Sequence, residues 1–85
     1  MEVIYHSEAL SDIEYWKKSG NVLVQKRISA LIADICEHPF SGIGKPEPLK
    51  YTLSGCWSRR ITHGDRLIYE VVDGHLHILS MRGHY

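Results

Sequence analysis

A loop rich in glycine and proline divides the chain into two halves with different hydrophobic patterns. Residues 41–48, SGIGKPEP, hold two glycines and two prolines, which is typical of a loop. Apolar residues recur at helical spacing before this loop, whereas short apolar runs separated by turn residues follow it. Helices followed by successive strands predict an α+β fold, with the helices packed on one face of an antiparallel β-sheet.

The first half predicts a short N-terminal strand and then a helical hairpin. Residues 3–5 are apolar and suit the strand, and residues 7–20 follow as the first helix. Ser7 is its expected N-cap, and Gly20 is expected to end it. The apolar residues of this helix recur every three positions: Leu10, Ile13 and Trp16.

The second helix is expected over residues 21–38. Asn21 is a favourable N-cap, and Pro39 cannot continue a helix. The two helices should pair as an antiparallel hairpin joined at Gly20. One apolar stripe faces the core: Ile28, Leu31, Ile32 and Ile35.

The second half predicts a meander of β segments. They are residues 47–53, 57–62, 66–72 and 76–81. Asp73-Gly74 is the strongest hairpin signal among the turns between them. Alternation in the third segment places Leu67 and Tyr69 on the core face and Arg66 on the opposite, open face.

Length and charge limit the classes of protein that this chain can represent. The 85 residues are expected to form a single domain, 1–85. The net charge is zero, although residues 1–40 carry four basic and six acidic side chains and residues 41–85 carry six and four. This balance argues against a protein that coats nucleic acid by charge alone. An anion-binding surface is expected in the second half.

Membrane, secreted and metal-scaffold classes are not expected. No apolar run approaches the ~18 residues that span a bilayer, and no leader pattern is present, so a cytoplasmic location is predicted. Cys36 and Cys56 lack the spacing of a disulfide framework or a zinc site. His75 and His77 share a strand face, but spacing fixes no third ligand, so no metal or cofactor is expected.

Glu47 is a candidate general base because it lies between two prolines. A residue before proline is restricted to extended backbone, so the carboxylate at Glu47 is held in place. The alternative is a solvated loop glutamate, which is the commoner role for this residue type.

Basic residues that surround Glu47 in sequence suggest a phosphate-binding surface. Arg59 and Arg60 face opposite sides of a strand, so only one of them can join Arg66 in a single patch. Lys45 and Lys50 are the other candidates for contact with a phosphate. Solvated strand charges that discourage edge pairing are the alternative.

The chain ends on two residues with useful chemistry. His84 can serve as acid or base near neutral pH, and Tyr85 can stack on a nucleobase. A frayed tail is the alternative. Cys56 has no evident base partner, so it is not expected to be a nucleophile.

The sequence resembles the YoeB family of the RelE/ParE superfamily of bacterial toxin–antitoxin modules. The resemblance covers nearly the whole chain. Its specific motifs are the stretch GKPEPLKYTLSGCWSRRITHGDRLIYEV and the terminal RGHY. It implies a microbial-ribonuclease-like fold and an mRNA endonuclease that acts in the ribosomal A site. It also implies neutralisation by a YefM-like antitoxin.

The resemblance assigns roles to matching positions. The family's catalytic glutamate and arginine fall on Glu47 and Arg66, and its terminal pair on His84 and Tyr85. Lys50 and Arg60 match supporting basic positions. Three residues depart from the expected pattern: Cys56 for an aromatic residue, Asp65 where relatives often carry histidine or another residue, and Ile43 for a basic residue.

The chemistry of RNA agrees with this set. The 2′-OH is the nucleophile, so neither a metal nor a covalent enzyme intermediate is needed. We expect Glu47 to take the 2′-OH proton, His84 to protonate the leaving 5′-oxygen and Arg66 to stabilise the transition state. Two other functions stay open: a binding module that inhibits DNA gyrase, and an inactive adaptor that binds its antitoxin. Codon preference and dimerisation are not fixed by the sequence, although the apolar hairpin is compatible with a homodimer.

Overall fold

A strand and two helices precede the remaining strands of the protein. The computed structural model describes residues 1–83, so His84 and Tyr85 lie outside the described residues. The elements are β1 (Glu2–Tyr5), α1 (Ser7–Ser19), α2 (Val22–Glu37), β2 (Glu47–Pro48), the 3₁₀ turn η1 (Tyr51–Leu53), β3 (Trp57–Arg60), β4 (Arg66–Val72) and β5 (His75–Gly83). This confirms the α+β class and the helices-first order.

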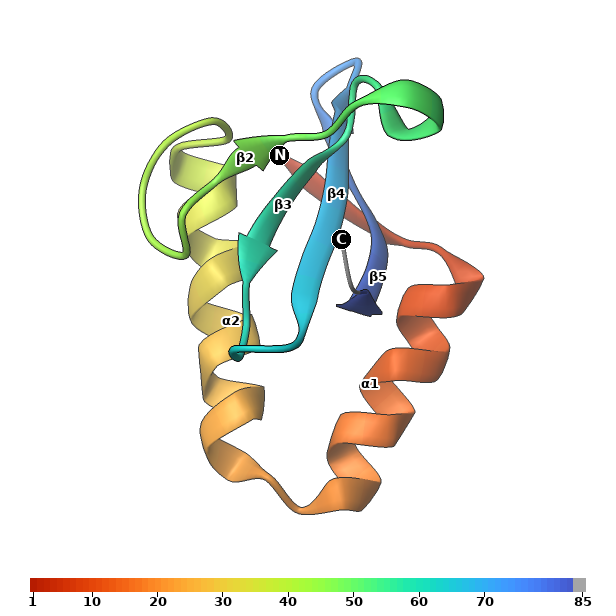
Figure 1. Ribbon diagram of the computed structural model, residues 1–85, viewed down its shortest axis with the longest axis vertical. Coiled ribbons are helices and arrows are strands. Elements are labelled where there is room, and N and C mark those ends of the chain that lie inside the picture. The colour runs from red at the N-terminus through yellow and green to blue at the C-terminus, as the bar shows by residue number, and fades with distance from the viewer. Residues whose placement is uncertain (84–85) are drawn as a thin grey trace.

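The strands form one mixed sheet in the order β1-β5-β4-β3-β2. Neighbours are antiparallel except that β1 runs parallel to β5, so the expectation of a wholly antiparallel sheet is wrong at this edge. A parallel pair needs a long crossover, and here both helices and the other strands lie between its members. In Figure 1, α1 and α2 form a V joined at its lower end, and the sheet lies across its upper part.

The sequence signals at the helix ends are mostly confirmed. Asn21 caps α2, since its side-chain oxygen accepts the Val24 N–H at 3.1 Å. Gly20 ends α1 in the left-handed region, with φ of 72°. Ser7 is not the N-cap: it is already helical, and His6 occupies the cap position without a side-chain bond. Within residues 1–83 no helix is long and apolar enough to cross a membrane.

The core lies between the helices and one face of the sheet. Leu31 and Ile35 of α2 pack with Leu67 and Tyr69 of β4, and all four are fully buried. The predicted core face of β4 is therefore confirmed. The cluster also contains Ala9, Trp16, Val24, Ile28, Ile61, Leu76, Ile78 and Met81.

Helix α1 holds the C-terminal part of β5. The register between β4 and β5 shifts near residues 66–69, as in a β-bulge. The Met81 N–H donates to Asp12 Oδ2 at 2.7 Å, and Trp16 Nε1 donates to the Met81 carbonyl at 3.0 Å. Both backbone groups of Met81 are thus satisfied by α1, which fixes the end of β5.

The expected strand over residues 47–53 is wrong beyond its first two residues. Only Glu47–Pro48 pairs with β3, and residues 51–53 form η1 instead. Pro48 has no N–H to donate to a ladder, and Tyr51 takes a positive φ of 58°, which ends extended backbone. Glu47 therefore lies on a very short edge strand.

Candidate functional site

Glu47 and Arg66 meet on the sheet, although 19 residues separate them in the chain. Arg66 Nη1 lies 3.2 Å from Glu47 Oε2 and also 3.2 Å from Ser58 Oγ. The Arg66 side chain is 18% exposed and that of Glu47 is 51% exposed. An ion pair this open to water contributes about 1 kcal/mol or less to stability. The pair therefore adds little to the stability of the fold.

Strand pairing explains how this geometry arises. Glu47 of β2 is the register partner of Ser58 on β3, and Arg66 of β4 is the partner of Arg60 on β3. Cross-strand partners share a face, so these four side chains lie on the same side of the sheet. We call this side the outer face, because its residues are absent from the core cluster beneath the helices.

The centre of the outer face is closed to water. Ser58, Ile68 and Ser80 are register neighbours across β3, β4 and β5, and their exposed fractions are 0%, 1% and 3%. Arg66 thus lies next to these three buried side chains, and its guanidinium donates a hydrogen bond to Ser58. The buried residues on this side restrict the rotamers of Arg66. They also exclude water, so the attraction between its charge and a bound anion is screened less than at a fully exposed site.

Three other predicted RNA contacts lie on the outer face or flank β2 in the chain. Arg60 is half-buried and shares the outer face with Arg66, and its Nε is buried without a hydrogen-bond partner among the described residues. Lys45 and Lys50 are exposed, and they flank β2 in the chain. They contribute positive charge on either side of Glu47.

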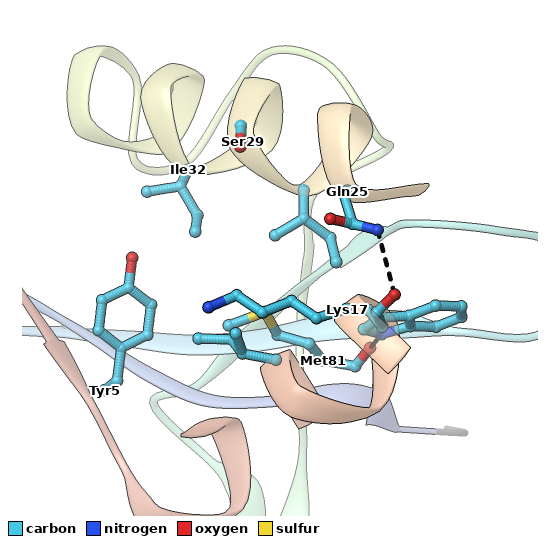
Figure 2. Close-up of a pocket in the computed structure, with 9 residues that line it drawn as sticks. Tyr5, Lys17, Gln25, Ser29, Ile32 and Met81 are labelled. Carbon is cyan, nitrogen blue, oxygen red and sulfur yellow. Dashed lines mark hydrogen bonds between the residues drawn. The ribbon is translucent and has the colours of Figure 1, made fainter. Parts of the chain in front are cut away.

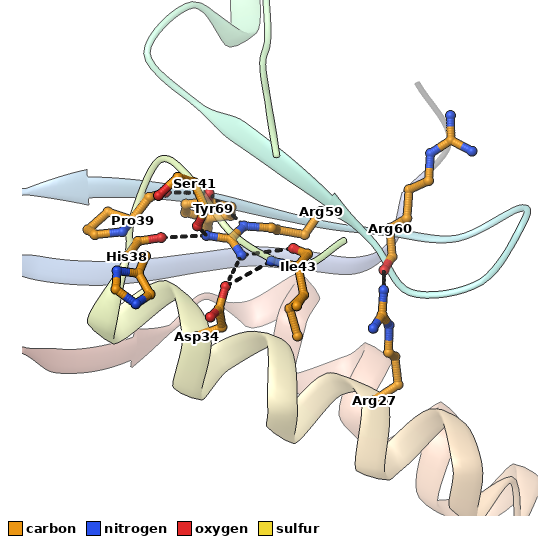
Figure 3. A network of polar contacts seen from close by, with 9 residues as sticks. All are labelled: Arg27, Asp34, His38, Pro39, Ser41, Ile43, Arg59, Arg60 and Tyr69. Atoms are coloured by element: carbon orange, nitrogen blue, oxygen red, sulfur yellow. Dashed lines mark hydrogen bonds and ion pairs between the residues drawn. The ribbon is translucent and has the colours of Figure 1, made fainter. Parts of the chain in front are cut away.

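Arg59 does not belong to this surface, and its assignment as an RNA contact is wrong. Its side chain is fully buried on the core face and forms an ion pair with Asp34 at 2.6 Å. Figure 3 shows its guanidinium enclosed by α2, the following loop and Tyr69, whereas the Arg60 side chain points away from this network. Strand alternation separates the two arginines, as the sequence indicated.

The ion pair changes the titration of its surroundings. The hydrogen bond from Arg59 is the main reason why the pKa of Asp34 lies below its ordinary value of 3.8. Burial raises the pKa of Tyr69 despite the neighbouring Arg59, which acts in the opposite direction. Tyr69 donates its hydroxyl to the Pro39 carbonyl at 2.6 Å, so it acts as a structural donor.

The three departures from the family pattern lie outside the Glu47–Arg66 pair. Cys56 is buried, and burial raises the pKa of its thiol, which leaves it a poor nucleophile. Asp65 accepts a hydrogen bond from the Thr62 hydroxyl at 2.8 Å within the turn before β4. Ile43 is 43% exposed, and it uses its backbone rather than its side chain to bind Asp34 and Arg59.

Histidines gather at the opposite edge of the sheet. His6 Nε2 lies 2.9 Å from His77 Nδ1, and His75 Nε2 lies 3.1 Å from Glu2 Oε1. Across residues 1–83, however, no three His, Cys, Asp or Glu side chains come together in a way that could hold a metal ion. These pairs are not adjacent to Glu47 in the sheet order, since β4 and β3 lie between.

A pocket of about 210 Å³ lies elsewhere, between the two helices and β5. Figure 2 shows Lys17 crossing it between Tyr5 and Gln25. Its lining holds no carboxylate or imidazole, so it offers no acid–base pair. The lining residues are Tyr5, Ile13, Trp16, Lys17, Gln25, Ile28, Ser29, Ile32 and Met81.

Sequence reasoning missed two polar partners. Ser58 holds Arg66, and Asp34 neutralises Arg59. Alternation along β3 puts Ser58 on the face of Arg60, but the register with β2 and β4 is not readable from one sequence. In the sequence Asp34 lies beside Ile35 of the apolar stripe, and a carboxylate at that place was the available signal for a buried cation.

Comparison with known proteins identifies the family. The model described as "YoeB-like toxin of bacterial type II toxin-antitoxin system" matches residues 5–85. A curated relative, Toxin YoeB of Escherichia coli strain K12, is 48% identical over 85 residues, which is 100% of both chains.

Solved structures agree with this similarity. The YoeB–YefM complex from Staphylococcus aureus contains a chain with a TM-score of 0.89 and 38% identity. The YoeB dimer from the same organism gives a TM-score of 0.91 and 37% identity. Each match covers 100% of this chain and 98% of the other.

Proposed function

Because the chain belongs to the YoeB-like toxins of bacterial type II toxin–antitoxin systems, we propose that it is an endoribonuclease that cleaves mRNA in the ribosomal A site. The observation that carries this proposal is the contact of Glu47 and Arg66 at 3.2 Å on the outer face. A carboxylate beside a guanidinium supplies a base and an anion binder within the span of one phosphodiester.

The RNA provides its own nucleophile in this scheme. Glu47 accepts the proton of the 2′-OH, which attacks the adjacent phosphorus as the bond to the 5′-oxygen breaks. Arg66 donates to the non-bridging oxygens, where negative charge builds up. Its bond to Ser58 leaves other N–H groups of the guanidinium for the phosphate. The products are a 2′,3′-cyclic phosphate and a 5′-OH end.

The remaining roles come from the family resemblance. His84 is the acid that protonates the leaving oxygen, and Tyr85 stacks on a base; both lie outside the described residues. Lys50 and Arg60, which match supporting basic positions of the family, hold flanking phosphates. Lys45 is assigned the same role from its position near Glu47 in the chain. No metal or cofactor takes part in these steps.

The charge of the chain supports dependence on the ribosome. The net charge is zero, so free RNA gains little from counterion release. The ribosome already restricts the conformation of mRNA in the A site. This removes much of the entropic cost of placing the 2′-OH in line with the leaving 5′-oxygen. Efficient cleavage of naked RNA at physiological salt contradicts this part of the proposal.

The partners follow from the same family. A YefM-like antitoxin is proposed to neutralise the protein, as suggested by the solved YoeB–YefM complex. Acidic residues of such a partner complement Arg60 and Arg66 of the outer face and the exposed lysines that flank β2 in the chain, Lys45 and Lys50. Self-association is proposed by analogy with the solved YoeB dimer.

The test uses purified ribosomes programmed with a defined mRNA. Glu47→Gln keeps the shape of the side chain and removes the base, and His84→Ala removes the acid. We expect each variant to lose at least about 10²-fold in cleavage rate. Glu14→Gln, on the exposed surface of α1, is the matched control and should cleave like the wild type.

Two results contradict the proposal. One is a wild-type protein that arrests growth without cutting mRNA, which favours a binding target such as DNA gyrase. The other is a Glu47→Gln variant that cleaves as fast as the Glu14→Gln control.

A further inference from the structure

The loop that leads to Glu47 is wrapped around one buried guanidinium. Arg59 Nη1 donates to Asp34 Oδ2 at 2.6 Å and to the Ile43 carbonyl at 2.9 Å. Its Nη2 donates to the carbonyls of His38 at 2.6 Å and Ser41 at 3.0 Å. The Nε completes the set with the Tyr69 hydroxyl at 3.2 Å. Five donors thus meet five acceptors, which is the full capacity of arginine.

Two partners of Arg59 form further hydrogen bonds with the backbone of the same loop. Asp34 Oδ2 also accepts the Ile43 N–H at 3.1 Å, and Tyr69 donates to the Pro39 carbonyl at 2.6 Å. Gly42 has φ of +117°, and a Cβ there would clash with Asp34 Oδ2. The backbone from residue 38 to residue 43 is therefore shaped around this ion pair (Figure 3).

This loop is connected to Glu47 by a short and stiff path. The Gly44 carbonyl accepts the Arg60 N–H at 2.7 Å, which joins the loop to β3. Pro46 and Pro48 then restrict the backbone on both sides of Glu47. The β2 ladder has only two residues, so it alone is a weak support for the position of Glu47.

The site of Arg59 is costly to maintain for stability alone. Burying a guanidinium and a carboxylate carries a desolvation penalty that a well-packed apolar pair avoids. Hydrogen bonds to four loop carbonyls, directly or through Tyr69, specify a backbone path that an apolar side chain cannot specify. The arrangement thus favours one defined conformation of the loop over a higher stability of the fold.

We propose that Arg59 is a positioning residue, which fixes the 38–46 loop so that Glu47 meets Arg66. Arg59 does not touch RNA, because its side chain is 0% exposed. The proposal rests on the nuclease function proposed above, in which Glu47 is the base. It predicts that loosening the loop slows the chemical step without weakening the binding of programmed ribosomes.

Two variants test this by different routes. Arg59→Lys keeps a cation for Asp34 but has three donors instead of five. Gly42→Ala pushes a methyl group into the Asp34 carboxylate and alters neither Arg59 nor Glu47. Ile35→Val, which trims the core on the same helix as Asp34, is the control for a general loss of stability.

Cleavage kinetics on programmed ribosomes give the first readout. We expect the maximal rate to fall about 10²-fold in Arg59→Lys and in Gly42→Ala, since a displacement near 1 Å has an effect of that order. The ribosome concentration at half-maximal rate should stay within about twofold of wild type, because no binding contact is removed. Ile35→Val should cleave at the wild-type rate.

Amide exchange gives a readout that does not depend on activity. The N–H groups of Ile43 and Arg60 bond to Asp34 and Gly44, so both should exchange at least about tenfold faster in Arg59→Lys than in Ile35→Val. Amides of the β4–β5 ladder should match between these variants.

The outcomes separate this proposal from the proposed function. If the wild type cleaves and both loop variants cleave as fast as Ile35→Val, Arg59 is not a positioning residue. A rise in the half-maximal concentration at an unchanged maximal rate also overturns it. If the wild type does not cleave, the nuclease function fails, whereas unchanged exchange at Ile43 and Arg60 overturns the loop-holding role independently.

Discussion

Arg66 Nη1 lies 3.2 Å from the Oε2 of Glu47 and 3.2 Å from the Oγ of Ser58. One nitrogen thus contacts a side chain of the adjacent strand β3 and a side chain of β2, the strand beyond it. The carboxylate that we propose as the base and the cation that we propose for the phosphate are held together before RNA arrives. Such preorganisation avoids reorganising the site during the reaction.

Arg66→Lys should abolish most of the cleavage while leaving the fold intact. A lysine ammonium is a point charge that cannot hold Ser58, Glu47 and a phosphate in the planar arrangement of a guanidinium. We expect a loss of about 10²–10³-fold in the rate of A-site cleavage. Arg27→Lys on α2 is the control, and circular dichroism checks the fold. Cleavage within about threefold of wild type would remove Arg66 from the catalytic set.

Arg59 and Asp34 should be strongly coupled in stability. Removing one partner leaves the other charge poorly compensated, so Arg59→Met should lower the free energy of unfolding by about 2–5 kcal/mol. Adding Asp34→Leu should recover part of that loss, which a double-variant cycle in urea measures. Arg60→Met is the matched control on the next residue of β3. Strictly additive effects of the two changes would show that the ion pair does not hold the loop.

Acid should remove the contribution of Asp34 to stability. Its pKa in the folded protein lies below 3.8, mainly because Arg59 donates to its carboxylate. As the pH falls, Asp34 therefore takes up a proton in the unfolded chain at a higher pH than in the folded protein. Its carboxylate contributes fully to the free energy of unfolding only above the pKa of the unfolded chain. The difference in unfolding free energy between wild type and Asp34→Asn should shrink from about pH 5 to about pH 2. The uncharged change Ser29→Ala should give a difference that does not vary with pH.

Cys56 should react slowly with alkylating reagents. Burial, followed by the nearby charge of Glu70, raises the pKa of its thiol, and the thiolate is the reactive form. In a Cys36→Ser background, iodoacetamide at about pH 8 should modify the native protein at least tenfold more slowly than the urea-unfolded chain. Equal rates in the two states would contradict the buried position of Cys56.

Local signals predicted most of the secondary structure. Asn21, Gly20 and the apolar stripes act within one or two helical turns, so they are visible in a single sequence. The direction of β1 is not visible there, because it depends on pairing with β5 more than 70 residues later. The strand after Glu47 ends early because Pro48 has no N–H for the ladder and the backbone turns at Tyr51. The proline is visible in the sequence, but the positive φ of a tyrosine is not.

The candidate site was only partly readable for a similar reason. Alternation correctly separated Arg59 from Arg60, but it does not say which of them faces the core. That choice depends on Asp34, which lies 25 residues earlier and reaches Arg59 only in the folded chain. The contact between Glu47 and Arg66 likewise requires the β2-β3-β4 order.

The ends of the RNA fragments test the central claim most directly. Wild-type protein is added to programmed ribosomes with a 5′-labelled mRNA, and the fragments are treated with polynucleotide kinase and with phosphatase. Free RNA with EDTA serves as the control for contaminating nucleases. We predict a 2′,3′-cyclic phosphate and a 5′-OH within the A-site codon, since the 2′-OH attacks while Glu47 takes its proton. A 3′-OH with a 5′-phosphate would show that water attacks instead, which contradicts the roles given to Glu47 and Arg66.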